Sequence, residues 1–171
     1  MIKKLNKYVL MAVAALALFS CAEEKEDTER AVQERILDAY VDVNYPSAKR
    51  LESGLVMIDN QPGTGDTLKM YQAGYFKYSI RSLGGVYSET NQEELARKLG
   101  TYSNSNYYGP KLYELGYETT YAGVEEVMHH MREGGKATFI LPPWLSYTTS
   151  KNSWNQNVSA IYDIELVEVI D

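Results

Sequence analysis

Two aromatic side chains stand where a surface turn usually carries polar residues. The stretch 133–147, EGGKATFILPPWLSY, opens on glycine, alternates in polarity like a strand and stops at two prolines. Trp144 and Tyr147 follow the prolines at once. Proline cannot donate to a sheet ladder, so the chain must leave the sheet there. A tyrosine just beyond such a strand has little packing reason to be there, and we interpret the segment as one wall of a ligand pocket.

A third aromatic residue stands out, and the other groups capable of chemistry are few. Trp154 lies in the polar run KNSWNQN, where a lone tryptophan suggests contact with a polypeptide or a surface. His129 and His130 are neighbours on an expected helix and point in different directions, so they lack the spacing of a metal pair. Cys21 is the only cysteine, which rules out an internal disulfide and a cysteine-based metal site. The sequence therefore predicts neither a metal nor a cofactor.

Strand patterns position these residues and recur after residue 53. Phe76, Tyr78 and Ile80 alternate with polar residues within 75–83, as expected of a half-buried strand. The pair Gly84-Gly85 predicts a hairpin turn after this strand. The other expected strands are 55–58, 113–115 and 159–170.

Two other helical patterns precede the main one. The segment 28–43 carries apolar residues on one helical face and ends before Pro46. This helix is expected to dock on the domain, with pairing to a second copy as the alternative. Thr90 and Glu93 have the spacing of a capping box, which predicts a short helix ending at Gly100.

The main helix is expected at 121–131, where Val124, Val127 and Met128 share one side. It lies between later strands and would cover the apolar face of an antiparallel sheet. The order of elements therefore predicts an α+β fold.

The first twenty residues have the pattern of a secretory signal. A basic start with Lys3, Lys4 and Lys7 precedes a short apolar run, 8–19, and the segment ends in Leu-Phe-Ser-Cys21. This ending looks like a lipobox, in which Cys21 becomes lipid-modified and begins the mature chain. Two or more acyl chains would hold the protein stably on a membrane. The alternative is a free thiol after an ordinary signal peptide.

The expected domains follow from this assignment: a signal peptide at 1–20, a tether at 21–28, an N-terminal helix at 29–46 and a main domain at 53–171. The acidic tether is a solvated spacer or, alternatively, a surface-export signal. Without the signal the chain has 14 basic and 23 acidic residues, a net charge of −9. This charge argues against nucleic acid as a partner and against electrostatic adhesion to anionic lipid. The lipid on Cys21 would therefore be the membrane contact.

Four segments together resemble the FKBP-type peptidyl-prolyl isomerases. They are Ser53-Gly-Leu, Phe76-Lys-Tyr-Ser, GVEEVMHHMREGGKATFILPPWLSY at 123–147 and SAIYDIELVEV at 159–169. The resemblance runs from about Ser53 to Ile170. The lipid-anchored arrangement is similar to lipoprotein members of that family, including those tied to gliding motility. The resemblance to the family implies a twisted antiparallel sheet wrapped around one main helix, here with an extra N-terminal helix.

The activity that this resemblance implies needs no acid, base, metal or cofactor. Rotation about an X-Pro amide breaks its resonance and crosses a barrier of about 20 kcal/mol. A dry apolar pocket that holds the proline ring and the twisted amide lowers that barrier. The expected substrate is a proline-containing polypeptide.

The resemblance also implies site residues. Tyr147 matches the tyrosine whose hydroxyl bonds the substrate carbonyl, and Tyr87 stands where the family has a pocket phenylalanine. Ser88 replaces the pocket aspartate, with Glu89 next to it, and these considerations give Tyr147, Tyr87 and Ser88 as catalytic residues. The expected substrate-binding residues are Tyr78, Tyr121, Val124, Trp144, Trp154 and Tyr162.

Several of these positions depart from the family pattern. Val124 replaces the tryptophan that floors the pocket, and Tyr121 replaces an isoleucine whose backbone contacts the substrate. Lys111 stands where another pocket phenylalanine is expected. The segment 88–109 is longer than usual, and its short helix could overhang the pocket.

Three functions follow from this reading. The first is an isomerase that assists folding of envelope proteins from a lipid-anchored position at the outer membrane, facing the periplasm or the surface, with activity reduced by the altered floor. The second is a non-catalytic polypeptide-binding or chaperone module on the same fold. The third is an accessory subunit of an outer-membrane assembly that docks through Trp154 and the inserted segment.

Overall fold

The computed structural model describes residues 28–117, 120–147 and 158–170, and the chain divides into two compact units, Met1–Asp38 and Ala39–Asp171. A helix occupies residues 28–44, in agreement with the apolar spacing and with its predicted end before Pro46. Its first turns carry an exposed ion pair between Arg30 and Glu34, which are 3.0 Å apart.

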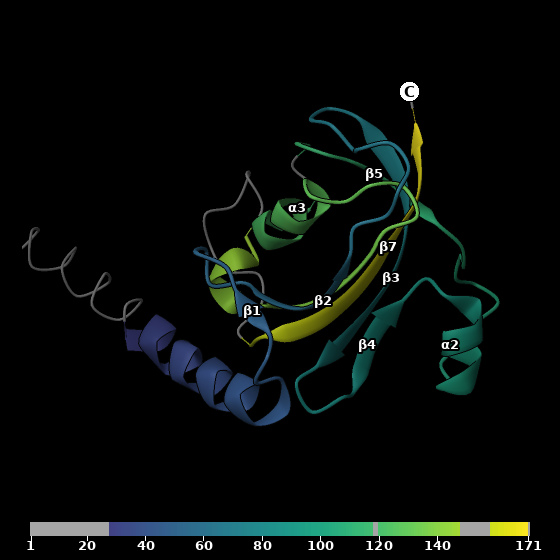
Figure 1. The fold of residues 1–171 in the computed structure, drawn as a ribbon. Coiled ribbons are helices and arrows are strands. Elements are labelled where there is room, and N and C mark those ends of the chain that lie inside the picture. Colours follow the sequence, from purple (N-terminus) through teal and green to yellow (C-terminus); the bar gives the residue numbers. More distant parts are fainter. Residues whose placement is uncertain (1–27, 118–119, 148–157, 171) are drawn as a thin grey trace, which may run out of the picture. The chain divides into compact units, whose positions relative to one another are not determined.

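The rest of the described chain contains one antiparallel sheet, two short α-helices and a 3₁₀ helix at Pro143–Leu145 (Figure 1). The strand order is β1-β2-β6-β7-β3-β4, and β5 pairs with a second part of β3. Figure 1 shows the sheet curving around α3, while α2 lies beyond β4 at the sheet edge. The strands are β1 (Lys49–Arg50), β2 (Val56–Gln61), β3 (Ala73–Ser82), β4 (Tyr87–Thr90), β5 (Lys111–Glu114), β6 (Lys136–Leu141) and β7 (Ala160–Ile170), and the helices are α2 (Glu93–Lys98) and α3 (Ala122–Met128).

The core lies between the inner face of the sheet and α3. Period-two alternation turns one row of side chains from each central strand toward the helix. Each large apolar side chain buried in this way contributes about 1.5–3 kcal/mol. The buried members of this cluster include Phe76 and Tyr78 from β3, Phe139 and Leu141 from β6, Ile164 and Leu166 from β7, and Val124, Val127 and Met128 from α3.

Glycine is required where the loop before β6 touches the loop after β2. Gly63 has φ +82°, and a Cβ atom there would lie 2.6 Å from the Arg132 carbonyl oxygen. A Cβ on Gly135 would lie 2.6 Å from the Pro62 carbonyl oxygen. Real Cβ contacts are essentially never this short, so Gly63 and Gly135 allow the two backbones to approach closely.

The predicted capping box is wrong. The residue before α2 is Gln92, and no side chain caps the helix. Thr90 belongs to β4, where its hydroxyl donates to the Tyr78 carbonyl (3.0 Å) and accepts from the Gln92 amide (3.1 Å). The Thr90 side chain is therefore bonded within the sheet edge and does not cap α2. The helix begins two residues later than a cap at Thr90 requires.

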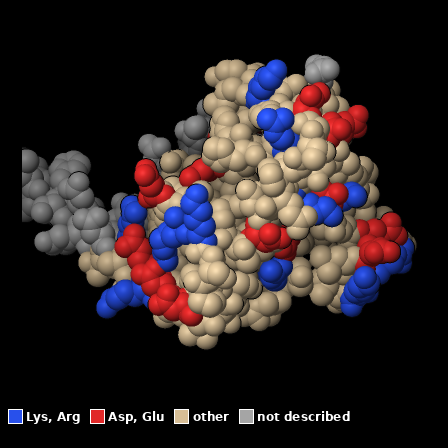
Figure 2. Space-filling model, viewed as in Figure 1, with Lys and Arg blue, Asp and Glu red and all other residues tan. Residues whose placement is uncertain are grey.

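On the face viewed in Figure 2, acidic and basic side chains of the described residues lie interspersed. Among these residues no helix is both long and apolar enough to cross a membrane.

Asp163 joins three strands on the outer face of the sheet. It accepts hydrogen bonds from Arg81, from the Ser79 hydroxyl at 3.2 Å and from the Thr138 hydroxyl at 2.8 Å. The side chains of Arg81 and Asp163 are only 19% and 31% exposed, so solvent can replace these contacts only in part.

We expect Asp163→Ala to lower the free energy of unfolding by about 2–3 kcal/mol, because it leaves a partly buried guanidinium without its carboxylate. Glu165→Ala is the control on the same strand, since Glu165 pairs with the more exposed Lys136 at 3.6 Å. This second change should cost less than about 1 kcal/mol. Urea denaturation of both variants measures the difference, and equal losses would contradict the role given to Asp163.

Candidate functional site

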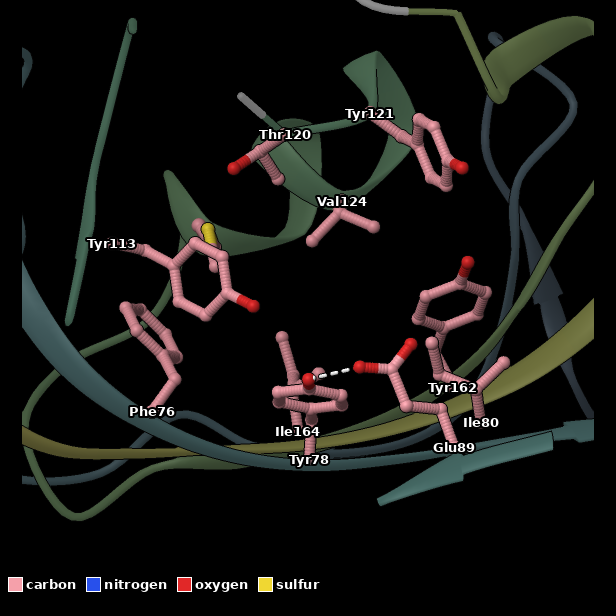
Figure 3. Close-up of a pocket in the computed structure, with 11 residues that line it drawn as sticks. Phe76, Tyr78, Ile80, Glu89, Tyr113, Thr120, Tyr121, Val124, Tyr162 and Ile164 are labelled. Carbon is pink, nitrogen blue, oxygen red and sulfur yellow. Dashed lines mark hydrogen bonds between the residues drawn. The ribbon is translucent and has the colours of Figure 1, made fainter. Parts of the chain in front are cut away.

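A cavity of about 220 Å³ lies between the inner face of the sheet and the start of α3 (Figure 3). Residues two apart in a strand lie on the same face of the sheet, so β3 contributes three alternate residues to the cavity. Rings and aliphatic side chains form most of its wall, and one carboxylate enters it. The lining residues are Phe76, Tyr78 and Ile80 from β3, Glu89 from β4, Tyr113 from β5, Thr120, Tyr121, Val124 and Met128 from α3 and the residues before it, and Tyr162 and Ile164 from β7.

The rings of the wall hold one another in edge-to-face contact. The ring centre of Tyr113 is 6.1 Å from that of Phe76 and 6.3 Å from that of Tyr78, with interplanar angles of 74° and 72°. On the β7 side, Tyr162 stacks on Phe139 at 5.4 Å. Such contacts favour fixed ring positions, so the cavity has a stable shape before any ligand enters.

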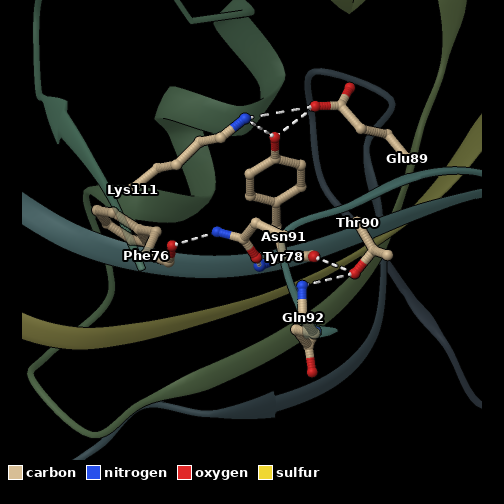
Figure 4. Close-up of polar contacts among 7 residues, drawn as sticks. All are labelled: Phe76, Tyr78, Glu89, Thr90, Asn91, Gln92 and Lys111. Atoms are coloured by element: carbon tan, nitrogen blue, oxygen red, sulfur yellow. Dashed lines mark hydrogen bonds and ion pairs between the residues drawn. The ribbon is translucent and has the colours of Figure 1, made fainter. Parts of the chain in front are cut away.

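The Tyr78 hydroxyl lies at the centre of a polar group at the edge of the cavity (Figure 4). It donates a hydrogen bond to the Glu89 carboxylate and accepts one from the Lys111 ammonium group at 2.8 Å. Lys111 Nζ is also 3.8 Å from a Glu89 oxygen. Burial, reinforced by the hydrogen bond to Glu89, raises the pKa of Tyr78 well above its ordinary value. The hydroxyl therefore stays protonated and acts as a hydrogen-bonding group, not as a base.

The Asn91 side chain is bonded to the backbone of β3 on both sides of this site. Its side-chain oxygen accepts from the Tyr78 amide at 2.7 Å and its side-chain nitrogen donates to the Phe76 carbonyl at 2.9 Å. β3 pairs with β4 through residues 79–81 and with β5 through residues 73–76, so these two backbone groups lie at the junction between the partners. The buried Asn91 amide satisfies both groups where the ladder is interrupted.

Thr120 supplies a buried polar atom to the cavity wall. The residue is 8% exposed, and no hydrogen-bond partner reaches its hydroxyl among the described residues. A buried hydroxyl without a partner costs free energy, so its presence in a cavity wall is consistent with a partner supplied by a ligand.

The cavity brings together four of the nine predicted pocket residues: Tyr78, Tyr121, Val124 and Tyr162. The sequence interpretation missed several others that share their faces. Phe76 and Ile80 lie two residues either side of Tyr78, and Met128 lies four residues after Val124, so strand and helix periodicity could have indicated them.

A bulge in β4 decides which polar side chain enters the cavity. Ile80 pairs with Glu89 but Arg81 pairs with Tyr87, so the register shifts at Ser88. Glu89 therefore faces the cavity, whereas the Tyr87 ring lies 5.8 Å from the Arg81 guanidinium. Ser88 is exposed, and its hydroxyl donates to the Ile80 carbonyl at 3.3 Å. Neither Tyr87 nor Ser88, both predicted as catalytic from the resemblance, lines the cavity, because the bulge leaves Ser88 exposed and pairs Tyr87 with Arg81 on the outer face of the sheet.

Trp144 also lies elsewhere than predicted. Its side chain is 6% exposed, and the indole N–H donates to the Ser53 carbonyl at 3.1 Å. The ring approaches Gly54 so closely that a Cβ there would lie 2.9 Å from the indole nitrogen. Trp144 thus connects the segment after β6 to the loop before β2. Its ring is packed against that loop, which accounts for an aromatic residue at this position.

Tyr147 is half-buried, and its backbone is bonded to the first residue of α3. Its carbonyl accepts from the Ala122 amide at 3.0 Å, next to the lining residue Tyr121, but its side chain is not part of the lining. Trp154 and Cys21 lie outside the described residues. Within the described ranges no group of three or more His, Cys, Asp and Glu side chains could hold a metal ion.

Comparison with known proteins identifies related sequences and folds. The family model described as FKBP-type peptidyl-prolyl cis-trans isomerase matches residues 60–167. The FKBP-type peptidyl-prolyl cis-trans isomerase FkpA of Buchnera aphidicola subsp. Schizaphis graminum is 25% identical over 148 residues. That match covers 85% of this chain and 52% of the relative, so the chain spans about half the length of the curated relative.

Three solved structures share the fold. FkpA from Escherichia coli has a TM-score of 0.58 and 21% identity, over 95% of this chain and 70% of that one. A peptidyl-prolyl cis-trans isomerase from Pseudomonas syringae pv. tomato has a TM-score of 0.55 and 16% identity, over 85% and 96%. AtFKBP13 has a TM-score of 0.52 and 18% identity, over 72% and 99%.

These likenesses confirm the α+β sheet-and-helix fold, including the N-terminal helix, that the sequence predicts. Because the family model matches well over half of the residues, the chain belongs to the FKBP-type peptidyl-prolyl cis-trans isomerase family and carries its isomerase domain.

Proposed function

We propose that this protein catalyses cis–trans isomerisation of X-Pro bonds in polypeptides, and that the cavity between β3, β7 and α3 holds the proline. The observation that carries the proposal is the ring-lined cavity itself, on the inner face of a domain of this family. Its rings, the Glu89 carboxylate and the Thr120 hydroxyl, which has no partner among the described residues, suit an uncharged, twisted amide.

Catalysis here would rest on binding the twisted amide more tightly than the planar one. The rings exclude water around the proline, and hydrogen bonds to the amide are stronger where water is excluded. The Tyr147 hydroxyl remains our candidate for holding the substrate carbonyl, and Trp154 our candidate for an apolar contact beside the proline. Val124 gives the cavity a smaller floor than the tryptophan of the family, and we expect a reduced rate for this reason.

We further propose that the domain works in the cell envelope, on envelope proteins during folding, and is held at the outer membrane by a lipid on Cys21. The support is the basic start, the apolar run and the lipobox-like ending at residues 1–21.

The purified protein should accelerate isomerisation of a Leu-Pro peptide, measured by NMR exchange. Glu89→Ala should lower kcat/KM about tenfold, because it removes the carboxylate that fixes the Tyr78 ring in the wall. Ser88→Ala is the neighbouring control and should stay within about twofold, since Ser88 faces solvent.

An uncatalysed rate with the wild-type protein would remove the isomerase proposal. Suppressed aggregation of an unfolded client would then favour the polypeptide-binding module. Equal losses in the two variants would instead contradict the assignment of Glu89 to the cavity.

Thr120→Val should separate stability from activity. Replacing the unpartnered buried hydroxyl by a methyl group of similar shape should raise the free energy of unfolding by about 1 kcal/mol. The same change should lower kcat/KM several-fold if the hydroxyl bonds the substrate. Thr120→Ser, which keeps the hydroxyl, should retain most of the activity, and an active, unaffected Thr120→Val variant would exclude this role.

Cys21→Ser should release the protein from the membrane fraction of cells that make it, because the expected site of acylation is lost. Fractionation with detection of the protein tests this. Unchanged membrane association of the variant would show that another feature holds the protein there.

A further inference from the structure

A lysine and a glutamate from neighbouring edge strands meet over the rim of the cavity. Lys111 begins β5 and Glu89 lies in β4, and their charged groups are 3.8 Å apart on either side of the Tyr78 hydroxyl (Figure 4). Their side chains are 42% and 54% exposed, so both remain within reach of a ligand that enters from solvent. The resemblance to the family implies an apolar ring at position 111, and the charge there is therefore a property of this chain.

The two charges are not equally neutralised. Glu89 accepts a hydrogen bond from the Tyr78 hydroxyl, which stabilises the carboxylate directly. Among the residues that the structure describes, Lys111 has only a neutral hydroxyl oxygen at hydrogen-bond distance, and its separation from Glu89 exceeds the 2.7–2.9 Å typical of charge-assisted bonds. An ammonium group has three donors. Lys111 thus retains the capacity to bind a further acceptor, preferably an anion.

The position of this ammonium group defines which part of a substrate it can meet. Lys111 Nζ lies 5.2 Å from the centre of the Tyr78 ring, and Tyr78 lines the cavity. A proline packed against Tyr78 places its neighbour in the chain one Cα step, about 3.8 Å, further on. A carboxylate on that neighbouring residue would bind Lys111 if its side chain extends toward β5, which carries Lys111, and away from β4, which carries Glu89.

We propose that Lys111 makes this site selective for prolines with an acidic residue directly next to them. The inference rests on the proposed isomerase function and adds the class of substrate. Attraction to a contacting ammonium exceeds repulsion from a more distant carboxylate, because Coulomb energy falls with distance. A basic neighbour gains less, since Glu89 is already bonded to Tyr78 and Lys111 repels the incoming charge.

The test compares peptides that differ in one residue, Glu, Gln, Lys or Leu, placed directly before or directly after the proline. NMR exchange gives kcat/KM for each with the wild-type protein at low salt. We expect Glu to exceed its neutral analogue Gln by about threefold to tenfold in one of the two positions, with Lys below Gln. About 1 M salt should remove most of the difference.

Variants then locate the effect. Lys111→Met should make Glu and Gln equal, whereas Lys111→Arg should keep the preference. Lys136→Met is the matched control, because Lys136 also pairs with a strand glutamate, Glu165 at 3.6 Å, and begins a strand whose next residue, Ala137, turns into the core. This control should behave as the wild type. Unchanged melting temperatures would establish that the variants are folded.

The outcomes separate the two proposals. Acceleration of the Leu peptide without any difference between Glu and Gln would overturn the role of Lys111 and leave the isomerase proposal intact. Preference for Lys over Gln, or a Glu preference that survives Lys111→Met, would also overturn it. If no peptide is accelerated, the isomerase proposal fails, and the same peptides titrated by NMR shift changes still decide the charge preference.

Discussion

The site depends on how the Asn91 side chain completes the edge of β3. β3 exchanges one partner strand for another in the middle of its length, and the exchange leaves the Tyr78 amide and the Phe76 carbonyl at a gap in the ladder. Asn91 fills that gap with one donor and one acceptor. Without a group of this kind, buried backbone would be unpaired at the position that carries the main cavity ring.

This junction also explains why Glu89 and Lys111 meet. β4 and β5 both pair with β3, yet the chain between them runs through α2 and the segment 99–110. The Gly109 amide donates to the Asn91 carbonyl at 2.8 Å. This bond brings the end of the connecting segment back next to its beginning. The end of β4 and the start of β5 consequently lie on either side of Tyr78, and a carboxylate and an ammonium far apart in sequence share one hydroxyl.

Much of the fold could be predicted from the sequence, because regular alternation and helical spacing report burial directly. β3, β7 and α3 follow their apolar patterns, and Tyr78, Tyr162 and Val124 enter the cavity as their strand and helix faces require. Glu89 could not be selected in advance over Ser88. That choice depends on a bulge, and a shift of one residue exchanges the faces of a strand without changing its composition.

The stretch 133–147 sets the distance between the sheet and the helix, and in this way it determines the cavity. Gly123 in α3 approaches Leu141, the last residue of β6, so closely that a Cβ would lie 2.3 Å from it. Trp144 and Tyr147 hold the following turn to Ser53 and Ala122. Tight contact at this end of α3 is compatible with open space at Val124 and Thr120, which face β3 and β7. The stretch therefore meets the start of the helix through Leu141 and the Tyr147 carbonyl, and rings from other strands form the wall.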